Sequence, residues 1–127
     1  MSEGLKNIFT VTSKVIKGVG MGRRLGFPTI NLVYPEHIDF GTGVYLCEVE
    51  LPDEAYFGVM HLGPRETFDN VETFEVFLLN FEGGDLYGVE CKVDILKKLR
   101  DVKRFENSEK LVAQIEKDIE KAQKLLT

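Results

Sequence analysis

A period-2 pattern of apolar residues constrains the fold of this chain more than any other feature of its sequence. Residues 45–51 carry Tyr, Cys, Val and Leu at every second position, and residues 89–95 carry Val, Cys, Val and Ile in the same way. Side chains two residues apart lie on the same face of a β-strand. Both segments are therefore predicted to be strands that place one face on a hydrophobic core.

Three further segments favour strands. Residues 9–17, 56–62 and 73–81 are rich in Val, Phe, Thr and Tyr, and Gly, Pro, Asp or Asn residues separate them. Residues 82–85 (Glu-Gly-Gly-Asp) lie between two predicted strands and are interpreted as a hairpin loop, because glycine adopts positive φ without strain. Five or six short strands predict a mainly β fold, with a closed or nearly closed barrel over residues 8–106.

The pattern changes near Asn107. From residue 108 to 126 the apolar residues recur at helical spacing, with Lys, Glu and Gln between them. An amphipathic C-terminal helix is predicted here, with Asn107 or Ser108 as its N-cap. Its apolar stripe must pack on the barrel. The apolar positions are Leu111, Val112, Ile115, Ile119, Ala122 and Leu126.

Composition excludes several classes of protein. A length of 127 residues fits one domain, residues 1–127. A net charge of −5 argues against nucleic-acid binding, and no apolar stretch reaches the length of a membrane span. Cys47 and Cys91 each lie in an alternating apolar segment and are predicted to be core residues. A reduced, cytoplasmic protein without membrane or nucleic-acid partners is expected.

Four glycines fall within nine residues at positions 18, 20, 22 and 26, next to Arg23 and Arg24. Free backbone amides and positive charge suit a phosphate cradle, although no Gly-Lys-Ser/Thr follows. A flexible turn explains the same glycines equally well. With only two histidines and two separated cysteines, a zinc site would lack its usual ligands, so any metal is expected to be a hard cation bound by oxygens.

Thr29 and Asn31 follow Pro28 and stand two residues apart. In extended backbone this spacing directs a hydroxyl and an amide oxygen to one face, where both could bind Mg²⁺. The alternative is a turn in which the two side chains bond the local backbone.

Glu75 shares a predicted strand face with Phe77, Leu79 and Phe81. An unpaired carboxylate among apolar side chains is costly, and desolvation raises its pKa toward the range of a useful general base. Alternatively, Glu75 is an edge residue that reaches solvent or pairs with an arginine.

Basic and aromatic residues lie together in the segment 99–105, between the last predicted strand and the helix. Such side chains can hold a flat ligand by stacking and a phosphate by charge. Equally, Lys103 and Arg104 are solvated and Phe105 anchors the helix.

Taken together, these segments resemble the riboflavin kinase (flavokinase) domain over about residues 15–126. The resemblance rests on short motifs in a matching order and spacing. They are Gly22-Arg23, Leu25-Gly26-Phe27-Pro28-Thr29-Ile30-Asn31-Leu32, Gly43-Val44-Tyr45, Phe74-Glu75-Val76, Asp85-Leu86-Tyr87-Gly88, and Leu99-Arg100 with Phe105.

The resemblance implies a six-stranded antiparallel, Greek-key-like β-barrel with a C-terminal helix. It also implies Mg²⁺-dependent transfer of the γ-phosphoryl group of ATP to the 5′-hydroxyl of riboflavin, which yields FMN and ADP. By the same resemblance, Glu75 is the catalytic base, and Thr29 and Asn31 bind the metal. The implied nucleotide residues are Gly18, Gly20, Gly22, Arg23, Gly26, Pro28, Thr29 and Tyr87. The implied flavin residues are Arg100, Lys103, Arg104 and Phe105.

The chain departs from this family pattern at identifiable positions. The family usually shows Arg-Pro-Thr-Phe where residues 65–68 are Arg-Glu-Thr-Phe, so Glu66 replaces the proline and the loop is expected to differ in shape. Phe77 and Asn80 replace a frequent His and Asp, without an expected loss of activity. No nucleotidyltransferase motif is present, so a monofunctional kinase is expected. A monomer is expected as well. The alternatives are a non-catalytic flavin- or nucleotide-binding module and an excised domain of a bifunctional FAD synthetase.

Overall fold

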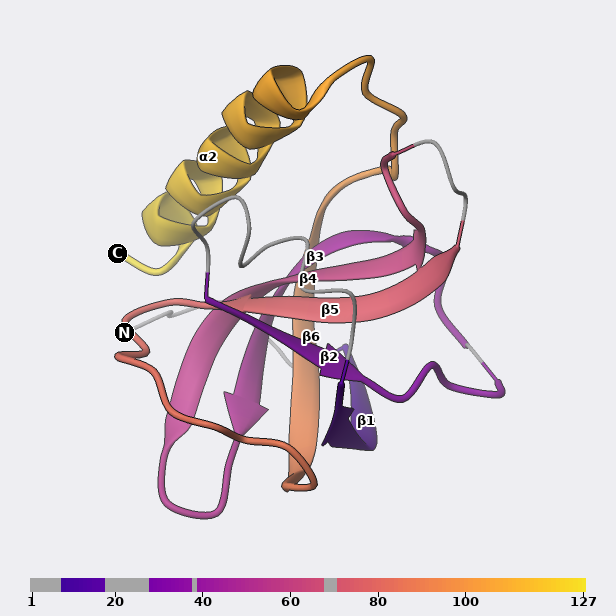
Figure 1. Ribbon diagram of the computed structural model, residues 1–127. Helices are drawn as coiled ribbons and strands as arrows, with labels where there is room; N and C mark the ends of the chain where they lie inside the picture. Colours follow the sequence, from indigo (N-terminus) through magenta and orange to yellow (C-terminus); the bar gives the residue numbers. More distant parts are fainter. Residues whose placement is uncertain (1–7, 18–27, 38, 68–70) are drawn as a thin grey trace.

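Six strands and one helix make up the computed structural model, which describes residues 8–17, 28–37, 39–67 and 71–127 (Figure 1). The strands are β1 (Phe9–Ile16), β2 (Thr29–Leu32), β3 (Gly43–Glu50), β4 (Ala55–Pro64), β5 (Glu72–Leu78) and β6 (Glu90–Arg100), and the helix is α2 (Ser108–Leu125).

The strands close into a barrel in the order β1-β2-β5-β4-β3-β6, and every paired neighbour is antiparallel. Closure gives each strand two neighbours, which reduces the sheet edge that a small β-protein otherwise has to protect. β1 and β2 share only two residue pairs, Val15 with Leu32 and Ile16 with Asn31. The six-stranded antiparallel barrel with a C-terminal helix is therefore confirmed.

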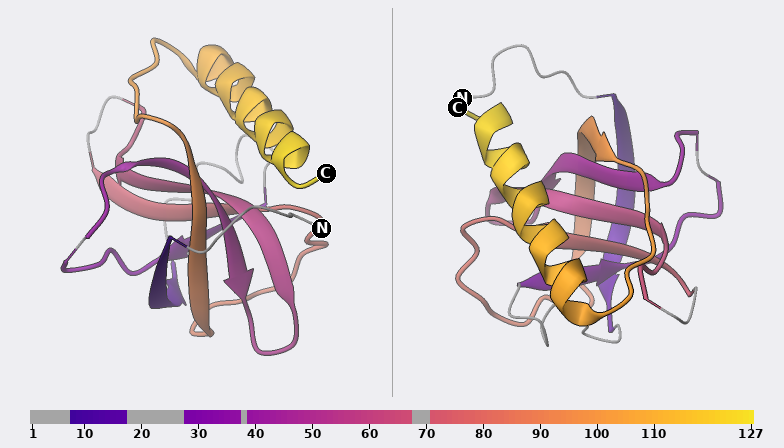
Figure 2. Two further views of the ribbon diagram at one scale, coloured as in Figure 1. Left: turned by 180° about the vertical axis from the view of Figure 1, so that it is seen from behind. Right: turned by 90° about the horizontal axis from the view of Figure 1, so that it is seen from above.

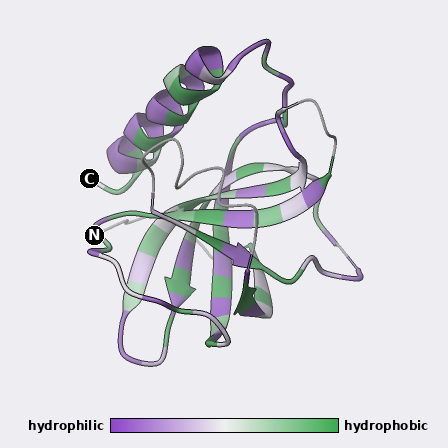
Figure 3. Ribbon diagram, viewed as in Figure 1, coloured by the Kyte–Doolittle hydropathy of each residue, from purple (hydrophilic) through white to green (hydrophobic). Residues whose placement is uncertain are grey.

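Alternating side chains fill the interior of the barrel, and Figure 3 shows the matching alternation of hydrophobic and hydrophilic residues along the strands. Cys47 and Cys91 are both buried in this core as free thiols, as predicted. Burial raises the pKa of both thiols, so neither is poised for thiolate chemistry. The interior residues include Ile30, Leu32, Met60, Leu62, Phe74, Val76, Val93 and Ile95.

The predicted hairpin at residues 82–85 is wrong. Gly83 and Gly84 do adopt positive φ, 110° and 119°, but the strands on either side are not neighbours. β5 pairs with β2 and β4, whereas β6 pairs with β1 and β3. The segment therefore crosses the barrel end. β5 also stops at Leu78 instead of residue 81, since Asn80 adopts a left-handed turn with φ of 62°.

The helix lies across the outside of the barrel (Figure 2). Of the two candidate N-caps, Asn107 fills the role, because its side chain accepts a hydrogen bond of 2.9 Å from the backbone N–H of Lys110. Leu111, Ile115 and Ala122 are buried, as the amphipathic pattern predicts. Among the described residues, no helix has the length and apolar character needed to span a membrane.

Candidate active site

Three of the predicted site residues lie on one outer face of the barrel. Ile30 and Leu32 point into the core, so Thr29 and Asn31 point outward, because successive strand residues alternate. Asn31 lies opposite Glu75, and Thr29 lies opposite Phe77 in the β2–β5 register. Directly opposed residues share a face. The hydroxyl, the amide and the carboxylate therefore lie on the same outer face, whereas the spacing in the sequence predicts a shared face only for Thr29 and Asn31.

Glu75 occupies a largely desolvated position on this face. Burial raises the pKa of its carboxyl group, while the positive charge of Arg65 and a hydrogen bond with Thr73 act in the opposite direction. Oε1 of Glu75 is buried and accepts no hydrogen bond from the described residues. This oxygen is thus available to accept a proton from a bound ligand. Pairing of Glu75 with an arginine was the alternative interpretation, and Arg65 lies close enough for its charge to lower the pKa of Glu75.

His61, which the sequence analysis did not select, supports the same carboxylate indirectly. It pairs with Glu75 across the β4–β5 register. Because a carbonyl oxygen only accepts, Nε2 donates to the Pro64 carbonyl at 3.0 Å, and Nδ1 lies 3.2 Å from Oγ1 of Thr73. Burial lowers the pKa of His61, which favours the neutral ring. His61 lies opposite Glu75 because β4 pairs with β5, and the spacing of residues in the sequence does not reveal which strands pair.

A cavity of about 50 Å³ lies between this outer face and α2. Apolar side chains form most of its wall, and polar groups from β4, β5, β6 and the helix converge on it. Small-molecule sites are usually lined in this way, although they are larger, about 300–1,000 Å³. The lining residues include His61, Arg65, Glu66, Glu75, Phe77 and Arg100.

Arg100 lies at the end of β6 and is the centre of a buried ion network. Its Nε donates to both carboxylate oxygens of Asp118, at 2.9 and 3.0 Å, and its two terminal nitrogens donate to the two oxygens of Glu66, at 2.5 and 2.9 Å. Glu66 and Asp118 are 7% and 3% exposed. The guanidinium predicted to contact a flavin is thus bonded to two buried carboxylates, a role that the sequence analysis did not foresee.

The segment that follows Arg100 divides between a buried and a solvated part. Phe105 is buried against Leu111 and Ile115 of the helix, which is the anchoring role considered as an alternative. Lys103 and Arg104 are exposed, and Nζ of Lys103 lies 5.4 Å from the centroid of the Phe105 ring.

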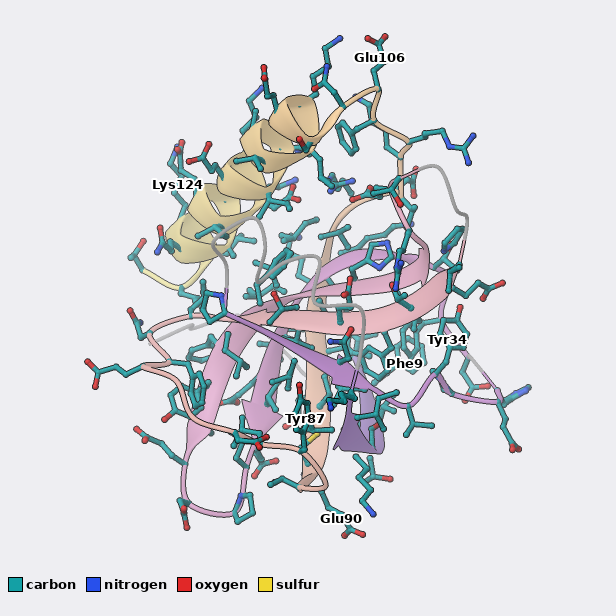
Figure 4. The ribbon with its side chains drawn as sticks, viewed as in Figure 1. Phe9, Tyr34, Tyr87, Glu90, Glu106 and Lys124 are labelled. Atoms are coloured by element: carbon teal, nitrogen blue, oxygen red, sulfur yellow. The ribbon has the colours of Figure 1, made fainter. Side chains whose placement is uncertain are left out.

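Tyr87 lies elsewhere, beside the end of β1. Nζ of Lys17 sits 5.9 Å from the centroid of the Tyr87 ring, and Lys17 is the last described residue before the glycine-rich segment. Figure 4 shows Tyr87 far from Glu106, which follows the basic segment. Pro28 is exposed, and its carbonyl accepts the N–H of Leu78 at 3.0 Å. The predicted residues Gly18, Gly20, Gly22, Arg23 and Gly26 lie outside the described residues.

The donor set on this face fits a hard cation. Hydroxyl and amide oxygens suit Mg²⁺, which commonly completes its shell with water and phosphate oxygens. No cluster of three or more His, Cys, Asp or Glu residues able to hold a metal occurs in the described part of the chain. A magnesium ion would therefore depend on oxygens that its phosphate ligand brings.

The fold and this pocket define a β-barrel protein with a candidate small-molecule site on its outer face, and comparisons with known proteins give the family. A family model described as riboflavin kinase matches residues 5–126. The chain therefore belongs to the riboflavin kinase family.

Individual relatives agree with this assignment. The RNA-binding riboflavin kinase RibR of Bacillus subtilis is 39% identical over 111 residues, which are 86% of this chain and 47% of RibR. The bifunctional riboflavin kinase/FMN adenylyltransferase of Escherichia coli K12 is 36% identical over 112 residues, 87% of this chain and 36% of that protein. The chain thus spans less than half the length of these curated relatives.

Solved structures show the same fold. The crystal structure of a macrolide-efflux protein from Streptococcus pneumoniae matches with a TM-score of 0.78 and 32% identity, over 90% of this chain and 38% of that one. The crystal structure of riboflavin kinase from Trypanosoma brucei matches with a TM-score of 0.65 and 23% identity, over 96% and 81%.

Proposed function

We propose that this chain is a monofunctional riboflavin kinase that transfers the γ-phosphoryl group of ATP to the 5′-hydroxyl of riboflavin. The observation that carries the proposal is the buried Glu75 carboxylate, which shares one outer barrel face with Thr29 and Asn31 beside a pocket. A non-catalytic binding module would not need a buried carboxylate with an available oxygen.

In the proposed reaction, Glu75 accepts the proton of the riboflavin hydroxyl as its oxygen forms a bond to the γ-phosphorus of ATP. The bond from that phosphorus to the bridging oxygen breaks, and ADP leaves. Phosphoryl transfer asks the protein mainly for alignment and charge neutralisation. Arg65 contributes positive charge near Glu75, and Thr73 and His61 hold the carboxylate's surroundings in place.

Thr29 and Asn31 would hold Mg²⁺ together with phosphate oxygens of the nucleotide. When bound, the ion supplies charge neutralisation at the transferred phosphoryl group. The residues proposed for the rest of the nucleotide are those given by the family resemblance, from the glycine-rich segment to Pro28 and Tyr87. Lys103 and Arg104 are proposed to face the flavin, and Arg100 and Phe105 are proposed to act by holding their segment.

Partner and location are also proposals. A net charge of −5 favours a small-molecule enzyme without nucleic-acid or membrane partners, active as a cytoplasmic monomer. RNA binding is part of the name of the Bacillus subtilis relative, of which this chain matches 47%.

Incubation with riboflavin, ATP and Mg²⁺ followed by chromatography of the flavins tests the proposed function. We expect FMN without FAD, and no FMN after chelation of Mg²⁺. Quenching of riboflavin fluorescence without any FMN would instead identify a binding module. An absence of both would reject riboflavin as the ligand.

Replacement of Asn31 by Ala is expected to change the dependence on metal. Loss of one oxygen ligand weakens the Mg²⁺–nucleotide complex, so the Mg²⁺ concentration for half-maximal rate should rise by about tenfold. Gln123→Ala serves as the control, because Gln123 is an exposed amide side chain on α2. An unchanged Mg²⁺ dependence of Asn31→Ala would reject its role as a ligand.

A further inference from the structure

Glu66 joins three parts of the molecule through one buried carboxylate. Its two oxygens accept hydrogen bonds from the guanidinium of Arg100, and Oε2 also accepts the backbone N–H of Lys103 at 2.8 Å. Its own carbonyl accepts the N–H of Phe105 at 3.3 Å. Glu66 is therefore bonded to the start, middle and end of the segment that begins at Arg100.

These bonds account for a carboxylate that is 7% exposed. A buried carboxylate is tolerated when charged or backbone donors satisfy its oxygens. The guanidinium is fixed in turn by Asp118 of the helix. The result is a rigid connection from the end of β4, through Glu66 and Arg100, to residues 101–107 and α2.

The chemistry of this position distinguishes the chain from the family pattern, which usually has proline there. A proline side chain has no oxygen, so it could bond neither the terminal nitrogens of Arg100 nor the N–H of Lys103. The loop was expected to differ in shape from the family pattern. The structure shows that it also differs in bonding, because the Glu66 carboxylate accepts hydrogen bonds from Arg100 and from the N–H of Lys103.

We propose that Glu66 is a positioning residue for the flavin substrate, because it fixes residues 101–107 against the barrel. The proposal rests on the proposed function, in which Lys103 and Arg104 face the flavin. A segment that is already ordered loses less conformational entropy when it binds a ligand. Glu66 therefore contributes to riboflavin binding by keeping this segment ordered.

The kinetic test compares Glu66→Gln with Glu106→Gln. Glutamine keeps the size of Glu66 but loses its charge and one acceptor oxygen. Glu106 lies within residues 101–107 and is exposed, and its carboxylate forms an ion pair with Lys110 at 3.0 Å. We expect the riboflavin KM of Glu66→Gln to rise about tenfold, with the ATP KM and kcat within about twofold of wild type. Glu106→Gln should match the wild type in all three.

A merely structural role would give a different pattern, with the ATP KM or kcat changed as much as the riboflavin KM. That result, or an unchanged riboflavin KM, would overturn the proposal.

A second measurement follows the segment itself and does not depend on kinase activity. Trypsin cleaves after Lys103 and Arg104, both of which are exposed. We expect native-state cleavage at these two sites to be about tenfold faster in Glu66→Gln than in wild type or Glu106→Gln. Equal cleavage rates in Glu66→Gln and wild type would refute the proposal that Glu66 fixes residues 101–107. If the wild type forms no FMN, the proposed function fails, and the cleavage rates still decide whether Glu66 fixes the segment.

Discussion

Replacement of Glu75 by Gln is expected to lower kcat for FMN formation by roughly two to four orders of magnitude. Glutamine keeps the shape of the side chain on β5 but cannot accept the hydroxyl proton. The carboxylate it replaces is buried, with one oxygen that accepts no hydrogen bond from the described residues. Riboflavin binding should persist, because the apolar wall of the pocket is unchanged.

Two measurements separate the loss of the base from a loss of structure. Rapid-quench or steady-state kinetics gives kcat, and quenching of riboflavin fluorescence gives the dissociation constant. Glu90→Gln is the matched control, since Glu90 is an exposed carboxylate at the start of β6. A near-normal kcat in Glu75→Gln would remove Glu75 from the mechanism.

The rate should also depend on pH in a way that Glu75 determines. Burial raises the pKa of this carboxyl group, and only the ionised form can act as a base. As the pH falls through the raised pKa of Glu75, kcat should therefore decrease. This decrease should begin at a higher pH than it would for a glutamate with an ordinary pKa. The residual rate of Glu75→Gln should lack this decrease.

The sequence predicted those parts of the fold that depend on local patterns. The alternation in residues 45–51 and 89–95 and the helical spacing after Asn107 each describe one element, and each element is present. The hairpin at residues 82–85 was predicted wrongly, because glycines indicate where a chain can turn and not which strands it joins. β6 also extends to Arg100, beyond the alternating residues, since pairing with β3 continues past irregularities in register.

The same distinction applies to the candidate site. Thr29 and Asn31 share a face because they are two residues apart, and the spacing alone predicts this. Glu66 and Arg100 are 34 residues apart in the sequence, and no local pattern pairs them. His61 likewise meets Thr73 only through the β4–β5 register. The one available signal at Glu66 was its departure from the family pattern.

Replacement of Arg100 by Met is expected to be the most destabilising of the substitutions considered for this protein. Methionine fills much of the volume but leaves Glu66 and Asp118 buried without their cation. Removal of one member of a buried ion network typically costs about 3–5 kcal/mol of unfolding free energy, which is a large part of the stability of a small domain. Burial alone would lower the pKa of Arg100, but its bonds to the two carboxylates outweigh burial and raise it.

Urea unfolding of the Arg100→Met variant measures this effect, with Arg104→Met as the control for loss of an exposed arginine. The control should stay within about 0.5 kcal/mol of wild type. Because the cost comes from the two stranded carboxylates, further replacement of Glu66 by Gln and Asp118 by Asn should restore part of the lost stability. A loss below about 1 kcal/mol in Arg100→Met, or a triple variant less stable than the single one, would contradict the view that the guanidinium neutralises a buried pair of charges.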